Sequence, residues 1–147
     1  MKRREFIKDC GAVCLGAIGI SLIGQGCTTG NYFAKTDISS NGVVVKKSEF
    51  VIISGHKIKQ RKYVLVKTDK SEFPIFLYKH NENEYSALLM YCTHKGCELQ
   101  AHGEFLVCPC HGSEFTNKGK VLNPPADEDL QQYKTSFDNE NIYIQLK

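Results

Sequence analysis

Two hexads, CTHKGC at residues 92–97 and CPCHGS at residues 108–113, constrain this chain more than any other feature of its sequence. They hold four of the seven cysteines and two of the five histidines. In each hexad a histidine follows a cysteine, two residues after Cys92 and three residues after Cys108. Each pair can chelate one metal from one loop, and mixed thiolate and imidazole ligation suits an iron–sulfur cluster or zinc. These residues are therefore the candidates for a metal site.

A mononuclear zinc ion held by two cysteines and two histidines is the natural competitor. Typical zinc fingers, however, take two cysteines from one segment and two histidines from another. Here each cysteine is paired with its own histidine, His94 in the first hexad and His111 in the second. The pattern favours an iron–sulfur cluster and leaves a zinc-bound structural lipoprotein as the less favoured alternative.

The body of the chain is predicted to be all-β. Runs rich in Val, Ile, Tyr and Phe recur at short spacing, and the polar segments HNENE, TNKGK and DNEN supply turns between them. The strand-like runs are GVVVKKSEFVII, KYVLVKT, FPIFLYKH, YSALLMYC, EFLVCPC, QQYKTSF and NIYIQLK. No stretch after residue 30 has a helical period over three turns, and NPPADEDLQQY is expected to be a loop with at most one helical turn. Both hexads should therefore lie in loops at strand ends.

The N-terminus has the pattern of a targeting segment. MKRREFIK is followed by an apolar, glycine-rich run from Cys10 to Gly24. Arg3 and Arg4 lie in a context that resembles the twin-arginine export signal, which carries folded proteins. The apolar run is about 15 residues long, shorter than the roughly 20 residues of a comfortable membrane span. Residues 1–27 are predicted to be a twin-arginine-type signal or membrane anchor, either uncleaved or cleaved with lipidation of Cys27.

Residues 28–42 are polar, carry Gly and Ser, and are predicted to be a linker, with one domain at residues 43–147. Charge is uneven: residues 39–79 hold nine Lys or Arg against three acids, whereas residues 80–147 hold five against ten. The net charge of +3 is too small to indicate nucleic-acid binding, and no nucleic-acid partner is expected.

The two hexads resemble the boxes of the Rieske proteins, Cys-Thr-His-x-Gly-Cys and Cys-Pro-Cys-His-Gly-Ser, at every fixed position. Thirteen residues separate His94 from Cys108, and the resemblance covers roughly residues 43–147, with cluster-binding loops at about 91–126. It implies a Rieske-like antiparallel sandwich with a small cluster-binding subdomain and one [2Fe–2S] cluster per chain, held by two cysteines and two histidines.

The resemblance also assigns the ligands. Two cysteines would hold the buried iron and two histidines the outer iron: Cys92 and Cys108, and His94 and His111. Cys97 and Cys110 would form a disulfide between the loops. That cysteine pair marks the quinol-oxidising bc-type branch and its periplasmic relatives. It agrees with export, because structural disulfides persist in oxidising compartments.

Around the ligands, Gly96 and Gly112 would let backbone N–H groups approach the sulfur atoms, and Ser113 matches a hydroxyl donor to a bridging sulfide. Phe115 stands where high-potential members usually have Tyr. The remaining histidines are expected at the surface: His56, His80 and His102.

Two further positions depart from the pattern. Lys95 occupies a position that is usually aliphatic in bc-type complexes, where the loop tip enters the quinol pocket. Because burying an unpaired ammonium is costly, Lys95 favours an acidic partner surface. The Gly-Pro-Ala-Pro cover of the family is replaced by residues 123–126, NPPA.

The expected function is one-electron transfer as a subunit of an oxidoreductase. One form is the iron–sulfur subunit of a quinol-oxidising cytochrome bc-type complex, partnered by the membrane, a cytochrome b or c, and quinol. There His94 or His111 would accept a quinol proton as the cluster takes an electron. The alternative is a periplasmic electron-transfer module, or the small subunit of another oxidoreductase, without a quinol site. In either form, the protein is expected to be exported and membrane-anchored on the periplasmic side.

Overall fold

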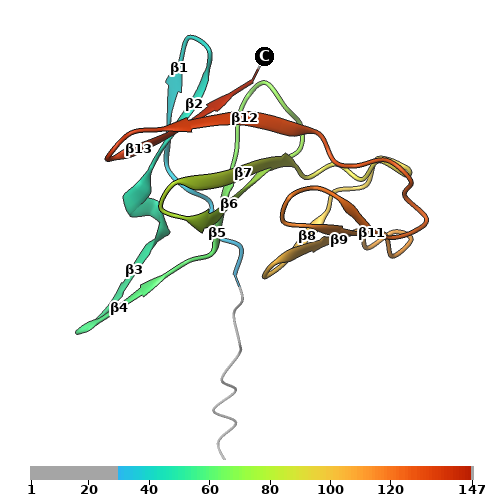
Figure 1. Cartoon of the computed structure of the whole chain (residues 1–147), viewed down its shortest axis with the longest axis horizontal. Coiled ribbons are helices and arrows are strands. Elements are labelled where there is room, and N and C mark those ends of the chain that lie inside the picture. The colour runs from blue at the N-terminus through green and yellow to red at the C-terminus, as the bar shows by residue number, and fades with distance from the viewer. Residues whose placement is uncertain (1–29, 147) are drawn as a thin grey trace, which may run out of the picture. The chain divides into compact units, whose positions relative to one another are not determined.

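The computed structural model describes residues 30–146, and the predicted signal or anchor at 1–27 lies outside them. The described residues form thirteen strands and one short 3₁₀ helix (Figure 1). In chain order these are β1 (Thr36–Ser39), β2 (Gly42–Lys46), the 3₁₀ helix η1 (Lys47–Phe50), β3 (Val51–Ser54), β4 (Lys57–Gln60), β5 (Tyr63–Val66), β6 (Ile75–Asn81), β7 (Glu84–Leu89), β8 (Gln100–His102), β9 (Phe105–Val107), β10 (Glu114–Thr116), β11 (Val121–Asn123), β12 (Gln132–Phe137) and β13 (Asn141–Gln145). The all-β prediction is confirmed.

Seven strands form the main sheet, in the order β1-β2-β13-β12-β7-β6-β5, and all neighbours are antiparallel. The terminal hairpin expected around DNEN is present as β12 and β13. Thr135 and Ile144 face each other across this hairpin.

The main sheet lies between two hydrophobic cores. Strands β5, β6 and β7 are therefore buried on both faces. Side chains alternate along a strand, so neighbouring residues enter different cores. Val64 and Val66 of β5 pack in one core, whereas Leu65 packs in the other. The distal core contains Val43, Val45, Phe50, Val64, Val66, Ile75, Leu77, Tyr85, Ala87, Ile142 and Ile144. The metal-side core contains Leu65, Phe76, Tyr78, Leu88, Met90, Cys92, Leu99, Leu106, Cys108, Phe115, Ala126 and Leu130.

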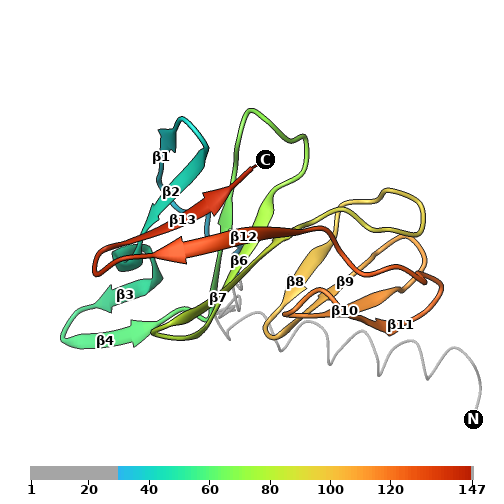
Figure 2. The same cartoon turned by 45° about the horizontal axis from the view of Figure 1, so that its top comes forward.

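The second sheet has the order β11-β10-β9-β8, and each of its strands has only three residues. We call this sheet and its flanking loops, residues 91–126, the cluster subdomain. Figure 2 shows its strands beside the main sheet. The Tyr78 hydroxyl of β6 donates to the Glu104 carboxylate in the β8–β9 turn at 3.1 Å. This hydrogen bond joins the two sheets.

Two sequence predictions about chain organisation differ from the structure. The run GVVVKKSEFVII is not one strand, because η1 interrupts it and buries Phe50 in the distal core. The predicted linker at 28–42 contains β1, and Tyr32 and Ala34 pack against the distal core. The Ala34 N–H donates to the Leu65 carbonyl at 2.8 Å, so this segment is held along β5.

Among the described residues, no helix is long and apolar enough to cross a bilayer.

Candidate metal centre

The first hexad forms a tight loop after β7. The Cys92 N–H donates to the Cys97 carbonyl at 2.9 Å, and the Gly96 N–H donates to the Cys92 carbonyl at 2.9 Å. Gly96 has a φ of +78°, a left-handed conformation that glycine adopts without steric cost. Tyr91 packs over this glycine, since a Cβ at residue 96 would lie 2.8 Å from the Tyr91 hydroxyl.

The second hexad repeats this construction. The Cys108 N–H donates to the Ser113 carbonyl at 2.8 Å, and the Gly112 N–H donates to the Cys108 carbonyl at 3.0 Å. Gly112 has a φ of +79°. Each loop thus starts at a buried cysteine, turns at a glycine four residues later and closes one residue after that. The sequence does not reveal this equivalence directly, because the histidines stand at different offsets.

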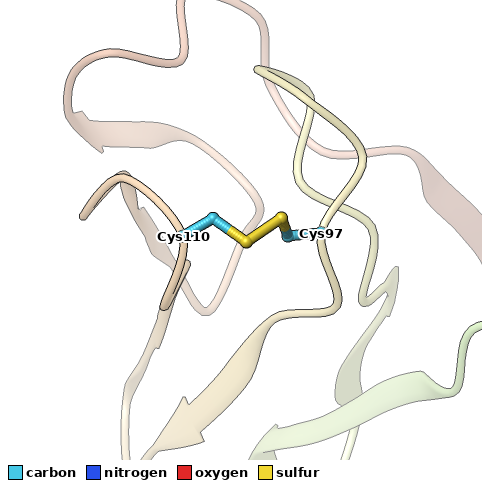
Figure 3. Close-up of a disulfide and its surroundings, with 2 residues drawn as sticks. All are labelled: Cys97 and Cys110. Atoms are coloured by element: carbon cyan, nitrogen blue, oxygen red, sulfur yellow. A yellow bond between two sulfur atoms is a disulfide. The ribbon is translucent and has the colours of Figure 1, made fainter.

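A disulfide between Cys97 and Cys110 joins the two loops, as predicted (Figure 3). Its Cα atoms are 6.5 Å apart, within the usual range for such a bridge. The sulfur atoms of these two cysteines and of Cys108 lie within 4.8 Å of one another. Since the bridged sulfur atoms are covalently paired, the Cys108 thiol is the one of the three that is free to bind metal.

The two free thiols are buried. Cys92 and Cys108 are each 1% exposed, and both belong to the metal-side core. Burial raises the pKa of the Cys92 thiol, and the neighbouring Cys108 thiol raises it further. The N–H groups of His94 and Lys95 act in the opposite direction, because they stabilise the thiolate. Two adjacent buried thiols are unfavourable as thiolates without a cation, which is the charge that a metal supplies.

The two histidines of the hexads lie next to each other. The rings of His94 and His111 are 4.9 Å apart between centroids and nearly perpendicular. His111 is exposed, whereas His94 is half-buried. The Nδ1 atom of His94 is buried and has no hydrogen-bond partner within the described residues 30–146. A buried polar atom normally has a partner, so this nitrogen is suited to metal ligation.

The donor set therefore fits a [2Fe–2S] cluster with mixed ligation. Two buried sulfur donors and two paired imidazoles lie on loops tied by a disulfide. The structure brings the predicted ligands together in two pairs, Cys92 with Cys108 in the metal-side core and His94 with His111 through their rings. That all four bind one cluster stays a prediction.

Other predicted residues surround this site. Ser113 is fully buried, and its hydroxyl oxygen accepts from the Ala126 N–H at 3.0 Å, which leaves its own proton free to donate. Phe115 is fully buried in the metal-side core with both free cysteines. Lys95 is exposed on the first loop.

Sequence reasoning missed two contacts that hold the loops in place. The Thr93 hydroxyl donates to the Glu128 carbonyl at 2.7 Å, which ties the first hexad to the segment after the prolines. Tyr91 packs edge-on against Phe73, with ring centroids 5.1 Å apart. Thr93 is a fixed position of the first Rieske box, and this was the only sign in the sequence that its side chain has a role. Nothing in the sequence alone indicates the role of Tyr91.

One surface prediction is wrong. His56 and His102 are exposed, but His80 is half-buried, with its Nε2 atom 2.7 Å from the hydroxyl of the buried Ser86. Burial lowers the pKa of His80. It lies on β6, one strand into the main sheet, where alternation turns its ring toward Tyr78.

The fold and the site define a small β protein with two buried free cysteines and two adjacent histidines on two disulfide-linked loops. Residues 48–134 match the model of the Rieske [2Fe-2S] domain, over more than half of the chain. The chain belongs to this family, and its cofactor is one [2Fe–2S] cluster, as predicted. The zinc alternative is not supported by this match.

Individual proteins that are similar to this chain are also iron-sulfur subunits. The chain is 32% identical over 63 residues to the cytochrome b6-f complex iron-sulfur subunit of Chlorobaculum tepidum, covering 42% of this chain and 35% of that protein. It is 42% identical over 53 residues to the same subunit of Synechococcus sp. (strain JA-2-3B'a(2-13)), covering 35% and 31%. The chain thus matches about a third of the length of these curated relatives.

Among solved structures, the plasma membrane Rieske protein PetC3 from Synechocystis PCC 6803 is similar. Its TM-score is 0.51 at 36% sequence identity, covering 57% of this chain and 86% of that one. This similarity agrees with the membership of the chain in the Rieske family.

Proposed function

We propose that this protein is a one-electron carrier whose ligands are Cys92, Cys108, His94 and His111. The observation that carries the proposal is the pairing of two buried free thiols with two adjacent imidazoles. A [2Fe–2S] cluster supplies reversible one-electron chemistry when it is bound. The chain supplies the ligands, excludes water on the thiol side and leaves His111 exposed.

The imidazole side is the route by which electrons would enter and leave. If the buried Nδ1 of His94 ligates iron, the proton of this ring resides on Nε2, and that proton responds to the charge of the centre. His111 is exposed and would present its ring to a partner. A quinol that gives up an electron and a proton would meet both acceptors here.

The partner would be a cytochrome bc-type complex, with the chain as its iron–sulfur subunit. The two curated relatives described above are named as subunits of such complexes, and this supports the assignment. Purification from native membranes tests it. A haem b protein should copurify with the chain, and quinol should reduce the centre. A chain that purifies alone and is not reduced by quinol would contradict the assignment.

One observation favours a second candidate, an electron-transfer module without a quinol site. Lys95 is exposed on the first loop, where an ammonium would be costly to bury in an apolar quinol pocket. Lys95→Leu discriminates the two. In a quinol-oxidising subunit it should leave turnover unchanged or raise it. In a carrier that docks on an acidic protein, it should slow electron transfer and reduce its salt dependence.

The protein would be exported and attached to the periplasmic side of the membrane through residues 1–27. The disulfide supports this location, since such bridges persist outside the reducing cytosol. Changing both Arg3 and Arg4 to Lys should retain the protein in the cytoplasm. Unaltered export of that variant would show that another pathway carries it.

A further inference from the structure

The β3–β4 hairpin is a two-stranded sheet of its own. Val51–Ser54 pairs with Lys57–Gln60, and neither strand pairs with any other strand of the described chain. In Figures 1 and 2 its turn points away from the other strands. Every residue of β4 is exposed. This hairpin contributes little to either core, so its sequence is free to serve another purpose.

One face of the hairpin is largely apolar, with Gln60 as its polar member. Ile53 lies directly opposite Ile58, and alternation places Val51 on the same face. Ile53 is 76% exposed and Ile58 is 75% exposed. Single exposed apolar residues are common on protein surfaces. Two isoleucines paired across the strands of a projecting hairpin instead form a contiguous exposed apolar patch.

The segment that carries this face is strongly basic, and alternation places Lys57 and Lys59 on the opposite face of the hairpin, on either side of Ile58. Residues 46–62 hold six Lys or Arg and one carboxylate, Glu49. Glu49 is already engaged, since it accepts from the Tyr32 hydroxyl at 2.8 Å and from the Lys35 N–H at 3.0 Å. None of the ion pairs found within residues 30–146 involves a cation of this segment. Lys57 and Lys59 on β4 are exposed and have no acidic partner there.

The base of the hairpin is also where the chain continues toward its N-terminal segment. The Arg61 guanidinium, just after β4, stacks on the Tyr32 ring at 3.8 Å from its centroid. Arg61 also donates to the Val51 carbonyl at 2.9 Å. Tyr32 is eight residues after Gly24, the end of the apolar run. An extended chain spans at most about 3.3–3.6 Å per residue, so this connection reaches less than about 30 Å.

We propose that the β3–β4 hairpin docks on the anionic surface of a lipid bilayer, with Ile53 and Ile58 entering the interface and the neighbouring lysines contacting headgroup phosphates. The inference rests on the proposed membrane attachment, because the short connection keeps the hairpin within reach of the bilayer. Amphipathic elements with an apolar face and lysines beside it bind membranes in this way. Long lysine side chains reach headgroups while their stems cover apolar surface.

An acidic protein surface could also attract the lysines. It would not require the apolar pair to be immersed in lipid. The depth of residue 58 in the bilayer therefore separates the two occupants.

The chain contains no tryptophan, so one introduced indole reports a single position. Full-length protein carrying Ile58→Trp is reconstituted into vesicles of phosphatidylglycerol and phosphatidylcholine, with and without brominated acyl chains. Ile38→Trp is the matched control, since Ile38 on β1 is 81% exposed and lies outside the basic segment. The ratio of emission in the two vesicle types removes any quenching by the metal centre.

Bromolipid should quench the indole at residue 58 and leave the one at residue 38 unquenched. Each lysine near an anionic surface is worth about fivefold in binding, so Lys57→Gln with Lys59→Gln should lower the equilibrium constant for docking about 25-fold. Quenching should also fall at 0.5 M salt or in pure phosphatidylcholine.

Three results would overturn the proposal or a part of it, and they are distinguishable. If the protein floats with vesicles but residue 58 is not quenched, membrane attachment stands and hairpin docking is wrong. If the protein does not float with vesicles at all, both are wrong. Quenching that is equal in neutral and anionic vesicles would overturn the role of the lysines.

Discussion

The main sheet and the cluster subdomain bury their apolar side chains by different means. Strands of the main sheet have four to seven residues and are covered on both faces at β5, β6 and β7. Strands of the cluster subdomain have three residues each. The core of the subdomain includes side chains of the main sheet. The subdomain also has a disulfide and a metal centre. The cluster subdomain is therefore stabilised by covalent and metal crosslinks, whereas the main sheet is stabilised by packing.

The largest effect is expected from removing one ligand. His94→Ala or Cys108→Ser should abolish the EPR spectrum of the reduced protein, because each removes a donor that no neighbouring side chain replaces. The main sheet should persist, so the far-ultraviolet circular dichroism should retain its β signal. Unchanged iron content and spectrum in either variant would exclude that residue as a ligand.

The disulfide comes next. Replacing Cys97 and Cys110 with Ala should lower the free energy of unfolding by about 2–4 kcal/mol. Hydrogen exchange should accelerate in the two loops and much less in β6 and β7. Uniform acceleration across both sheets would mean that the bridge stabilises the domain as a whole, and the contrast between the regions would fail.

A smaller effect is expected at Phe115. A ligand thiolate carries more negative charge in the reduced state, so a hydroxyl that donates to it raises the reduction potential. Phe115 is fully buried with both free cysteines but cannot donate. Phe115→Tyr should raise the midpoint by roughly 40–60 mV, from a difference of about 1–1.5 kcal/mol between redox states. Voltammetry of both proteins at one pH measures it, and a downward shift would contradict the role of this ring.

The smallest effect is expected at Asp138, in the turn between β12 and β13 of the main sheet. The pKa of Asp138 is lowered to about 2, first because the Tyr143 hydroxyl donates to it, and also through the N–H groups of Glu140 and Asn141. A lowered pKa gives stabilisation that is present above the ordinary value of 3.8 and is lost as the pH falls through about 2.

Asp138→Ala should therefore lower the unfolding midpoint slightly at pH 7, and parent and variant should converge at low pH. Urea titrations at both pH values measure the difference. The EPR spectrum at pH 7 should not change. A variant with an altered spectrum would show that the two regions are more closely coupled than their cores suggest.

Much of this structure follows from sequence because its signals are local. The paired Cys and His spacing identified the site, and the turn segment DNEN identified the terminal hairpin. The three-residue strands β8, β10 and β11 could not be predicted, since runs so short have no measurable alternation. Strand β1 was missed because its pairing with β2 depends on distant residues, and its own sequence is polar.

In the metal site, too, some features could be predicted from the sequence and others could not. The disulfide could be inferred from the resemblance of the hexads to the Rieske boxes. The packing of Tyr91 over Gly96 could not, because it depends on the left-handed turn at Gly96, which only the folded loop reveals. The burial of His80 was missed for a related reason: its ring contacts the hydroxyl of Ser86 on the neighbouring strand β7, and this contact forms only in the folded sheet.

The central claim is that the two loops jointly hold one cluster through two cysteines and two histidines. Pulsed EPR of the reduced protein, produced with ¹⁵N-labelled histidine, tests this most directly. We expect strong couplings to two histidine nitrogens in the parent protein. Coupling to no histidine nitrogen, or to only one in the parent protein, would contradict it.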